Sequence, residues 1–224
     1  MRLSRRQLFV YSSLLCFTAS LHAAAAANTA GNKSNTRANA VILIVGDSLS
    51  AEYGLQRGTG WVALLEQRLQ QEKINARVVN ASISGDTTSS GRSRLPALLQ
   101  QHRPSHVVIE LGANDALRGL PLNMTENNLQ TMSRAATASG AQVLLVGMQV
   151  PPNYGRSYTE SFAALFERVA KAEKNALVPF FLKGVADTPQ AESLFQADRI
   201  HPNEKAQTIM LGNVWPALRP LLLK

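Results

Sequence analysis

Short aliphatic runs alternate with segments of helical periodicity along most of this chain, and the alternation limits the folds open to it. Aliphatic runs without polar alternation are typical of strands buried on both faces of a sheet. The segments between them repeat apolar residues at helical intervals. Strands and helices in this order form βαβ units, with helices on both faces of a parallel sheet. The predicted fold is therefore α/β, a three-layer α/β/α sandwich with a five-stranded, mainly parallel sheet.

The expected elements can be placed by residue number. The strands are predicted at 41–45, 77–82, 106–112, 142–150 and 177–182, and the helices at 61–73, 87–102, 123–140, 157–175 and 202–218. Asn123 to Glu126 resembles a capping box that would begin the third helix. Pro202 suits the first turn of the last helix.

The N-terminal residues have the composition of a secretory signal peptide. Three arginines lead into an uncharged apolar run at 8–21, and the alanines at 23–27 offer small-residue cleavage sites. This order predicts that residues 1–27 are removed on export, so we expect a periplasmic or secreted protein. Residues 4–9 also resemble a twin-arginine signal, and the export route stays open between that pathway and the general one.

The rest of the chain is expected to form one domain. Residues 28–40 are small and polar and are predicted to be a flexible mature N-terminus, followed by a single domain at 41–224. The only cysteine, Cys16, lies in the predicted signal peptide, so the mature protein has no disulfide. The net charge of +8 comes from scattered basic residues. We therefore expect a monomer with no nucleic-acid partner and at most transient contact with a membrane surface.

A serine follows the first predicted strand at a position that favours chemistry. Gly46-Asp47-Ser48 comes directly after the aliphatic run at 41–45. Open α/β sheets bind ligands at the carboxyl ends of their strands, so the hydroxyl of Ser48 is a candidate nucleophile. Glycine, aspartate and serine are also ordinary turn residues. The remainder of the chain has to decide between these interpretations.

Further polar residues are predicted at the same edge of the sheet. Gly85 follows the second strand, Asn114 follows the third, and Asp198 and His201 precede the last helix. Serine, histidine and aspartate are the parts of a nucleophile, its general base and the group that orients the base. The N–H groups of Ser48 and Gly85 and the amide of Asn114 could form an oxyanion hole. No metal-ligand spacing, dinucleotide fingerprint or P-loop occurs, so we expect no metal and no cofactor.

Four sequence blocks together resemble a known enzyme family. They are Gly-Asp-Ser-Leu at 46–49, a lone glycine at 85, Gly-x-Asn-Asp at 112–115 and Asp-x-x-His-Pro at 198–202. In this order they resemble the GDSL or SGNH hydrolases over nearly the whole mature chain. Residues 44–51, 79–87 and 117–121 are most similar to the bacterial periplasmic thioesterase I/protease I/lysophospholipase group, which includes arylesterases. The resemblance implies the flavodoxin-like SGNH hydrolase fold.

The resemblance also implies roles for individual residues. Ser48 would be the nucleophile, His201 the base and Asp198 its partner, and Ser48, Gly85 and Asn114 would hold the oxyanion. The expected activity is hydrolysis of carboxylic esters and thioesters through an acyl-enzyme, with aryl esters, acyl thioesters or lysophospholipids as substrates. Two alternatives stay open: a carbohydrate O-deacetylase of the same family, and a binding or chaperone-like protein with a vestigial site.

Several residues are expected to contact the substrate or to modify the site. The substrate is predicted to meet Asp47 and, along the loops after the third and fourth strands, Leu120, Pro121, Pro151 and Tyr154. Glu52 stands where relatives are expected to have glycine, and either faces the site or is a solvated loop carboxylate. Arg199 is expected either to attract phosphate or to point to water. For His22, His102 and His106 we expect surface or capping roles.

Overall fold

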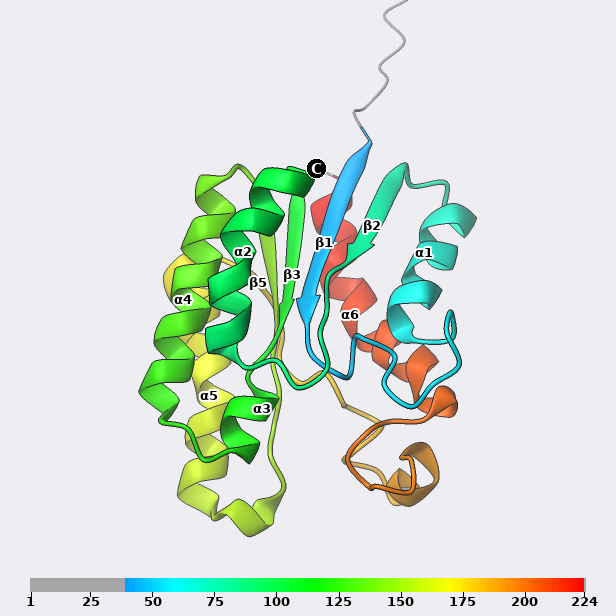
Figure 1. Ribbon diagram of the computed structural model, residues 1–224. Helices are drawn as coiled ribbons and strands as arrows, with labels where there is room; N and C mark the ends of the chain where they lie inside the picture. Colours follow the sequence, from blue (N-terminus) through cyan, green and yellow to red (C-terminus); the bar gives the residue numbers. More distant parts are fainter. Residues whose placement is uncertain (1–38, 224) are drawn as a thin grey trace, which may run out of the picture. The chain divides into compact units, whose positions relative to one another are not determined.

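The sheet has five parallel strands, as the sequence predicts (Figure 1). The computed structural model describes residues 39–223, so the predicted signal peptide and residues 28–38 lie outside the described residues. The strands are β1 (Ala40–Gly46), β2 (Ala76–Asn80), β3 (His106–Glu110), β4 (Gln142–Val146) and β5 (Ala176–Val178), in the order β2-β1-β3-β4-β5. Ala40, expected in the tail, belongs to β1 and pairs with Ala76.

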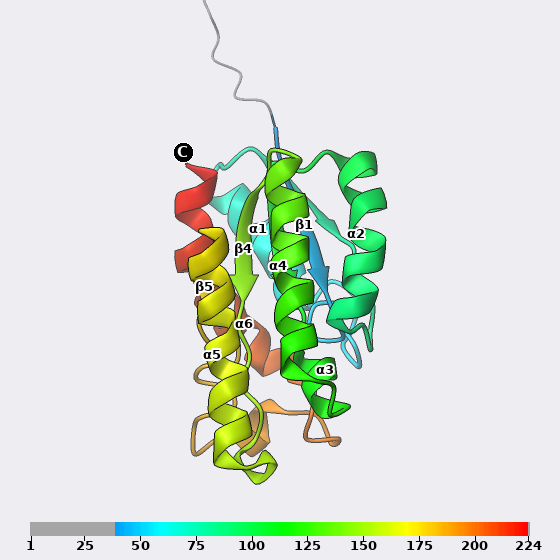
Figure 2. The ribbon, with the colours of Figure 1, turned by 90° about the vertical axis from the view of Figure 1, so that its left-hand side faces the viewer.

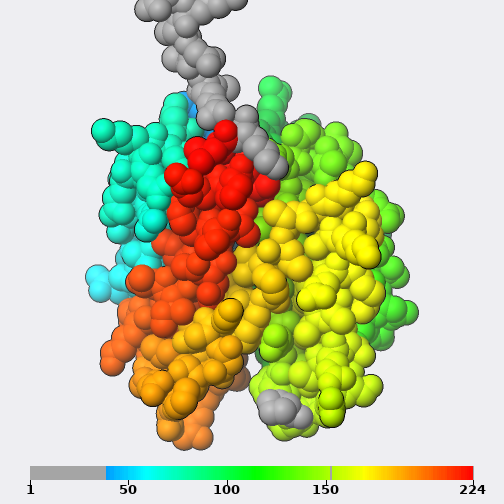
Figure 3. Space-filling model, turned by 180° about the vertical axis from the view of Figure 1, so that it is seen from behind, coloured from blue at the N-terminus to red at the C-terminus, as the bar shows by residue number. Residues whose placement is uncertain are grey.

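Helices cover both faces of the sheet and complete three layers (Figures 1 and 2). One layer contains α2 (Thr88–His102), α4 (Leu122–Ala138) and α5 (Arg156–Glu173), and the other contains α1 (Trp61–Gln71) and α6 (Glu204–Leu222). The view from behind shows α6 on the second layer, with the segment after β5 below it (Figure 3). None of the helices in residues 39–223 is both long enough and apolar enough to cross a bilayer.

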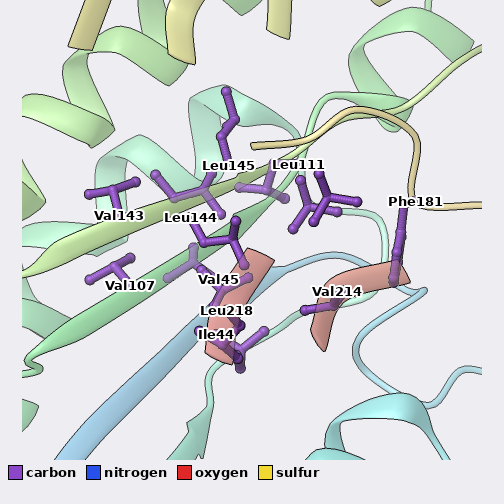
Figure 4. Packing of buried hydrophobic residues seen from close by; sticks show 14 of the residues in the cluster. Ile44, Val45, Val107, Leu111, Val143, Leu144, Leu145, Phe181, Val214 and Leu218 are labelled. Atoms are coloured by element: carbon purple, nitrogen blue, oxygen red, sulfur yellow. The ribbon is translucent and has the colours of Figure 1, made fainter. Parts of the chain in front are cut away.

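The core explains why the strands read as continuous aliphatic runs. Residues 42–45 of β1 are inaccessible to solvent, because the sheet is covered on both sides. Val214 and Leu218 of α6 pack against one face, with Phe181 beside them (Figure 4). Burial of this apolar surface is the main favourable contribution to folding.

Some predicted boundaries are wrong for local reasons. Strands β4 and β5 end four residues earlier than predicted. Gly147 N–H bonds to Val178 O and Phe181 N–H bonds to Gly147 O, and the pairing of the two strands ends with these bonds. Helix α4 begins at Leu122 without a side-chain cap, so the capping box does not form. Helix α6 begins at Glu204, where the side chain of Asn203 accepts the N–H of Lys205.

His106, for which a surface or capping role was expected, is buried in β3. One of its contacts does cap a helix. Its Nε2 atom lies 3.1 Å from the carbonyl oxygen of Leu221, in the last turn of α6. Burial lowers the pKa of His106, so the neutral ring that donates to this carbonyl is favoured. The side chain therefore satisfies one of the carbonyls that the end of a helix leaves unpaired.

Glu52 has a structural position that neither sequence interpretation foresaw. Its φ is +59°, a left-handed conformation that favours glycine. Its carboxylate accepts the N–H of Gly58 at 3.0 Å and the N–H of Gly60 at 2.8 Å. Gly60 is the N-cap of α1. Glu52 therefore closes the loop that precedes α1, and these hydrogen bonds offset the strain of its backbone.

We expect Glu52→Ala to lower the free energy of unfolding by about 1–3 kcal/mol, because charge-assisted hydrogen bonds are lost while the strained φ remains. Glu52→Gly should lose about 1 kcal/mol less, because glycine adopts this φ without strain. Urea denaturation measures both values. Glu66→Ala, at an exposed position on α1, is the control and should change stability by less than about 0.5 kcal/mol. Equal stability of Glu52→Ala and the unaltered protein would contradict this account.

Candidate active site

Ser48, His201 and Asp198 form one hydrogen-bonded chain. The Oγ atom of Ser48 lies 2.9 Å from Nε2 of His201, and Nδ1 of His201 lies 2.7 Å from Oδ2 of Asp198. An ionised carboxylate can only accept, so Nδ1 carries the proton of the neutral ring. Nε2 is then left to accept the hydroxyl proton of Ser48, which is the geometry of an activated nucleophile.

The loop before α6 fixes the aspartate and histidine locally. Oδ1 of Asp198 accepts the N–H groups of Ile200 and His201, at 2.9 and 3.0 Å. The backbone hydrogen bond from His201, followed by the bond from its side chain, lowers the pKa of Asp198 to about 2. The carboxylate is therefore ionised at neutral pH. The ring of Tyr53 packs against His201, with centroids 4.4 Å apart.

The three expected oxyanion donors come from the loops after β1, β2 and β3. Asn114 lies in the short helix α3 (Ala113–Leu117), and its Nδ2 donates to Oδ2 of Asp47 at 3.1 Å and to the carbonyl of Asp86 at 3.0 Å. Gly85 has a φ of +81°, and its carbonyl accepts Nη2 of Arg118 at 2.8 Å. Within residues 39–223 the N–H groups of Ser48 and Gly85 have no acceptor. Both are available to a ligand.

Asp115, next to Asn114, fixes this loop as a buried acceptor. Its carboxylate accepts the N–H and hydroxyl of Thr88 and the hydroxyl of Thr125. These contacts connect α3 to the starts of α2 and α4. Among the described residues, no cluster of histidine, cysteine or acidic side chains could hold a metal ion.

Two further carboxyl groups lie below the nucleophile. Asp47 is 1% exposed, and burial raises its pKa to about 6. Glu110 is also buried, and burial followed by the charge of Asp47 raises its pKa well above the usual range. Sequence reasoning missed Glu110. The available signal was a single acidic residue inside an aliphatic run predicted to be buried on both faces.

A cavity of about 580 Å³ opens beside Ser48 and His201. Asp47, Asn114 and Pro151 line it, as expected, but Leu120, Pro121, Tyr154 and Gly85 are not among the described residues that do so. Tyr154 instead packs on Tyr158. The unexpected wall follows β5 and β4 and is mainly apolar: Met148, Val150, Phe180, Leu182, Ala186, Phe195 and Ile200. Sequence reasoning placed Phe180 and Leu182 inside the fifth strand, and so missed them.

Arg199 lies at the edge of this cavity and pairs with Glu192, with Nη2 to Oε1 at 3.1 Å. Both side chains are exposed, so the pair is screened by water and contributes little to stability. Arg199 was expected either to attract phosphate or to point to water. In the structure its guanidinium is exposed to solvent beside the cavity and is paired with Glu192.

The raised pKa of Asp47 predicts how stability depends on pH. Asp47 stays protonated up to about pH 6 in the folded protein but ionises near pH 4 in the unfolded chain. Between these values the folded state binds more protons, so the free energy of unfolding falls as pH rises. Across this pH interval, we expect the free energy of unfolding of Asp47→Asn to fall by about 2 kcal/mol less than that of the unaltered protein. Chemical denaturation at each pH measures the difference, and parallel pH profiles would contradict the prediction.

Comparison with known proteins agrees with this geometry. Residues 44–209 match the model of the GDSL-like lipase/acylhydrolase family. Over 181 residues the chain is 54% identical to "Esterase TesA" of Pseudomonas aeruginosa, covering 81% of this chain and 89% of the relative. It is 44% identical to "Thioesterase 1/protease 1/lysophospholipase L1" of Escherichia coli K12, covering 81% and 84%.

The fold is shared as well. A crystal structure of TesA superposes with a TM-score of 0.78 at 54% identity, covering 81% of this chain and 99% of the other. Residues 44–209, which match the family model, include all four sequence blocks. The chain belongs to the GDSL-like lipase/acylhydrolase family.

Proposed function

We propose that the protein is a serine esterase that hydrolyses carboxylic esters and thioesters of linear acyl chains. The observation that carries this proposal is the hydrogen-bonded chain from Ser48 through His201 to Asp198, beside an apolar cavity. The apolar cavity can bind an acyl group, and the three hydrogen-bonded residues can transfer that group to the hydroxyl of Ser48. The similar proteins named esterase and thioesterase support the same chemistry.

In the proposed mechanism Oγ of Ser48 attacks the carbonyl carbon while Nε2 of His201 takes its proton. The N–H groups of Ser48 and Gly85 hold the negative oxygen that forms, and the amide of Asn114 joins them by exchanging its hydrogen bond to the carbonyl of Asp86 for one to the oxyanion. When the tetrahedral intermediate collapses, the imidazolium gives its proton to the leaving alcohol or thiol, which leaves an acyl-enzyme. Water then attacks this ester with His201 again as the base, which releases the acid and restores Ser48.

The cavity favours substrates with more than an acetyl group. Its walls are mainly apolar, and its volume of about 580 Å³ lies within the range of sites for drug-sized ligands. Each methylene group buried there would contribute about 0.8 kcal/mol. Aryl esters, acyl thioesters and lysophospholipids with extended chains all fit this description. An acetyl group alone, as a carbohydrate deacetylase would bind, would leave most of the cavity unfilled.

The surface around the cavity suits a substrate that is held in a lipid aggregate. Six large apolar side chains in residues 39–223 are exposed, and five lie in the segments that follow the strands at the carboxyl edge of the sheet: Tyr53, Ile83, Leu117, Tyr154 and Ile200. Each follows a different strand. Exposed apolar groups gathered at one end favour contact with an apolar partner. We propose transient contact with lipid surfaces during turnover.

The proposed setting is outside the cytoplasm. It rests on the composition of residues 1–27, which has the order of a cleaved export signal. The absence of cysteine after residue 16 is compatible with folding in either redox environment. We propose that the mature enzyme acts as a monomer in the periplasm or after secretion.

Ser48→Ala tests the nucleophile directly. With p-nitrophenyl esters of two to sixteen carbons, we expect kcat/KM to peak at intermediate or long chains, and Ser48→Ala to lower it at least 1000-fold on every ester. Circular dichroism provides the check that the variant is folded. Activity that survives in Ser48→Ala would refute the assignment of the nucleophile, and serine-dependent activity on acetate alone would favour a deacetylase.

Ile83→Ser tests the lipid surface. This side chain is 51% exposed and is not among the described residues that line the cavity. We expect the rate on micellar lysophospholipid to fall about two- to fivefold, because an apolar contact with the aggregate is lost. Leu223→Ser is the matched control, because Leu223 is exposed and directly follows α6, whose last turn contacts His106 at the start of β3, at the opposite end of the sheet. Equal rates for the two variants on micelles would contradict the proposed contact.

A further inference from the structure

A carboxyl group that takes no part in the proposed mechanism lies beneath the nucleophile. Glu110 is the last residue of β3 and is paired in register with Gly46 of β1. Its side chain is buried at 2% exposure. Burying an acidic group is costly unless it is hydrogen-bonded, paired or neutral. The contacts of the Glu110 side chain therefore indicate its role.

Glu110 contacts the turn of the nucleophile on both sides of Ser48. Its Oε2 atom accepts the hydroxyl of Ser50 at 2.7 Å and the N–H of Asp47 at 3.3 Å. The hydroxyl of Ser50 in turn accepts Nε1–H of Trp61 at 3.2 Å, at the start of α1. The turn is thereby attached to a central strand and to a helix by groups that are shielded from water.

Gly46 shows how closely the turn fits this carboxyl group. A Cβ atom added at Gly46 would lie 2.7 Å from Oε2 of Glu110 and 2.7 Å from Oγ of Ser50. No side chain can occupy that space without moving the carboxyl or the hydroxyl. The glycine of the Gly-Asp-Ser block is therefore required here by the contact between Glu110 and Ser50, in addition to any requirement of the turn.

The same carboxyl group reaches the oxyanion side of the site through Asp47. Oε2 of Glu110 accepts the backbone N–H of Asp47, and burial followed by the neighbouring carboxyl group of Asp47 raises the pKa of Glu110. Two carboxyl groups this close can share a hydrogen bond when one of them is protonated. Oδ2 of Asp47 accepts the amide of Asn114 at 3.1 Å, while Oδ1 accepts the N–H of Leu49 at 3.0 Å. Glu110, Asp47 and Asn114 thus form one connected path.

We propose that Glu110 is a positioning residue for ester hydrolysis: in its protonated form it holds the turn that carries Ser48 and, through Asp47, orients the Asn114 amide. It donates its proton to Asp47 and accepts from Ser50 and from the Asp47 backbone. This inference rests on the roles proposed above for Ser48 and Asn114. It adds a residue that never touches the substrate.

Burial favours the protonated form of the pair, and the charged groups around Asp47 act in both directions. Asp86, before α2, adds a negative charge near Asp47 and is paired with Arg94 of α2 at 2.7 Å. His201, before α6, acts on Asp47 in the opposite direction. Burial raises the pKa of Asp47 to about 6, and burial followed by the charge of Asp47 raises the pKa of Glu110 well above its usual range. The pair therefore keeps a proton at neutral pH.

Two substitutions of Glu110 separate positioning from mere packing. Glu110→Gln keeps a donor for Asp47 and an acceptor for Ser50, so we expect its kcat to stay within about threefold of the unaltered enzyme. Glu110→Leu removes both, and we expect kcat to fall about 10- to 100-fold with KM within about twofold, because the reacting groups lose their alignment. His106→Leu, a buried hydrogen-bonded residue at the other end of β3, is the matched control. It should lower stability but leave kcat unchanged.

A double-mutant cycle tests the path to the oxyanion hole. Because part of the effect of Glu110 acts through Asn114, Glu110→Leu combined with Asn114→Ala should lose less activity than the product of the two single losses. Fully additive losses would overturn the connection through Asp47. All measurements use the complete mature enzyme and p-nitrophenyl esters, after Ser48→Ala has shown that the activity depends on the serine. Survival of activity in Ser48→Ala would count against the proposed nucleophile, which is a separate failure.

The remaining outcomes are also decisive. A folded Glu110→Leu enzyme with unchanged kcat would overturn the proposal, as would a Glu110→Gln enzyme as impaired as Glu110→Leu. Where Glu110→Leu fails to fold, Ser50→Ala decides, since it removes only the hydroxyl that bonds to Glu110. We expect it to lower kcat at least about threefold at unchanged KM, and an unchanged kcat would overturn the proposal.

Discussion

The pairing of β1 with β3 is the constraint on which the site depends. The strand order places β2 on one side of this pair and β4 on the other, so the chain leaves β1 and β3 in opposite directions. Loops that diverge at such a point leave a crevice at the carboxyl ends of the strands. Ser48 follows β1 and Asn114 follows β3, so the proposed nucleophile and the proposed oxyanion donor line the same cavity. The site is a consequence of strand order.

Burial gives the acidic residues of this site opposite properties. Asp198 is near the surface, where hydrogen bonds from His201 lower its pKa to about 2. Asp47 is deeper and hydrogen-bonded to Asn114, yet desolvation raises its pKa to about 6. In the proposed mechanism an ionised carboxylate at 198 stabilises the imidazolium that turnover creates, and a proton shared between Glu110 and Asp47 limits the repulsion between these two carboxyl groups. The fold therefore keeps Asp198 ionised as a hydrogen-bond acceptor, while the nearby pair of Asp47 and Glu110 stays partly protonated.

The sequence predicted most of the fold and the principal polar residues, because both are encoded locally. Buried strands read as aliphatic runs, and Ser48, Asn114 and His201 stand in short blocks at strand ends. The wall of the cavity was not predictable in this way. Residues 177–182 read as one strand, and only contacts with Gly147, from another part of the chain, end β5 at Val178. The hydrogen bonds of Glu52 depend on a loop geometry that no local pattern specified.

The segment after β5 joins substrate contact to chemistry, since it supplies both a wall of the cavity and His201. It contains little regular structure, and side-chain amides hold it at two separate places. Asn213 of α6 donates to the carbonyls of Phe181 and Lys183, whereas Gln196 donates to the carbonyls of Tyr53 and Pro202. Phe180 and Leu182 of the wall are thus held from α6, whereas the stretch that carries His201 is held from the loop after β1, so both elements determine where the wall and the imidazole lie.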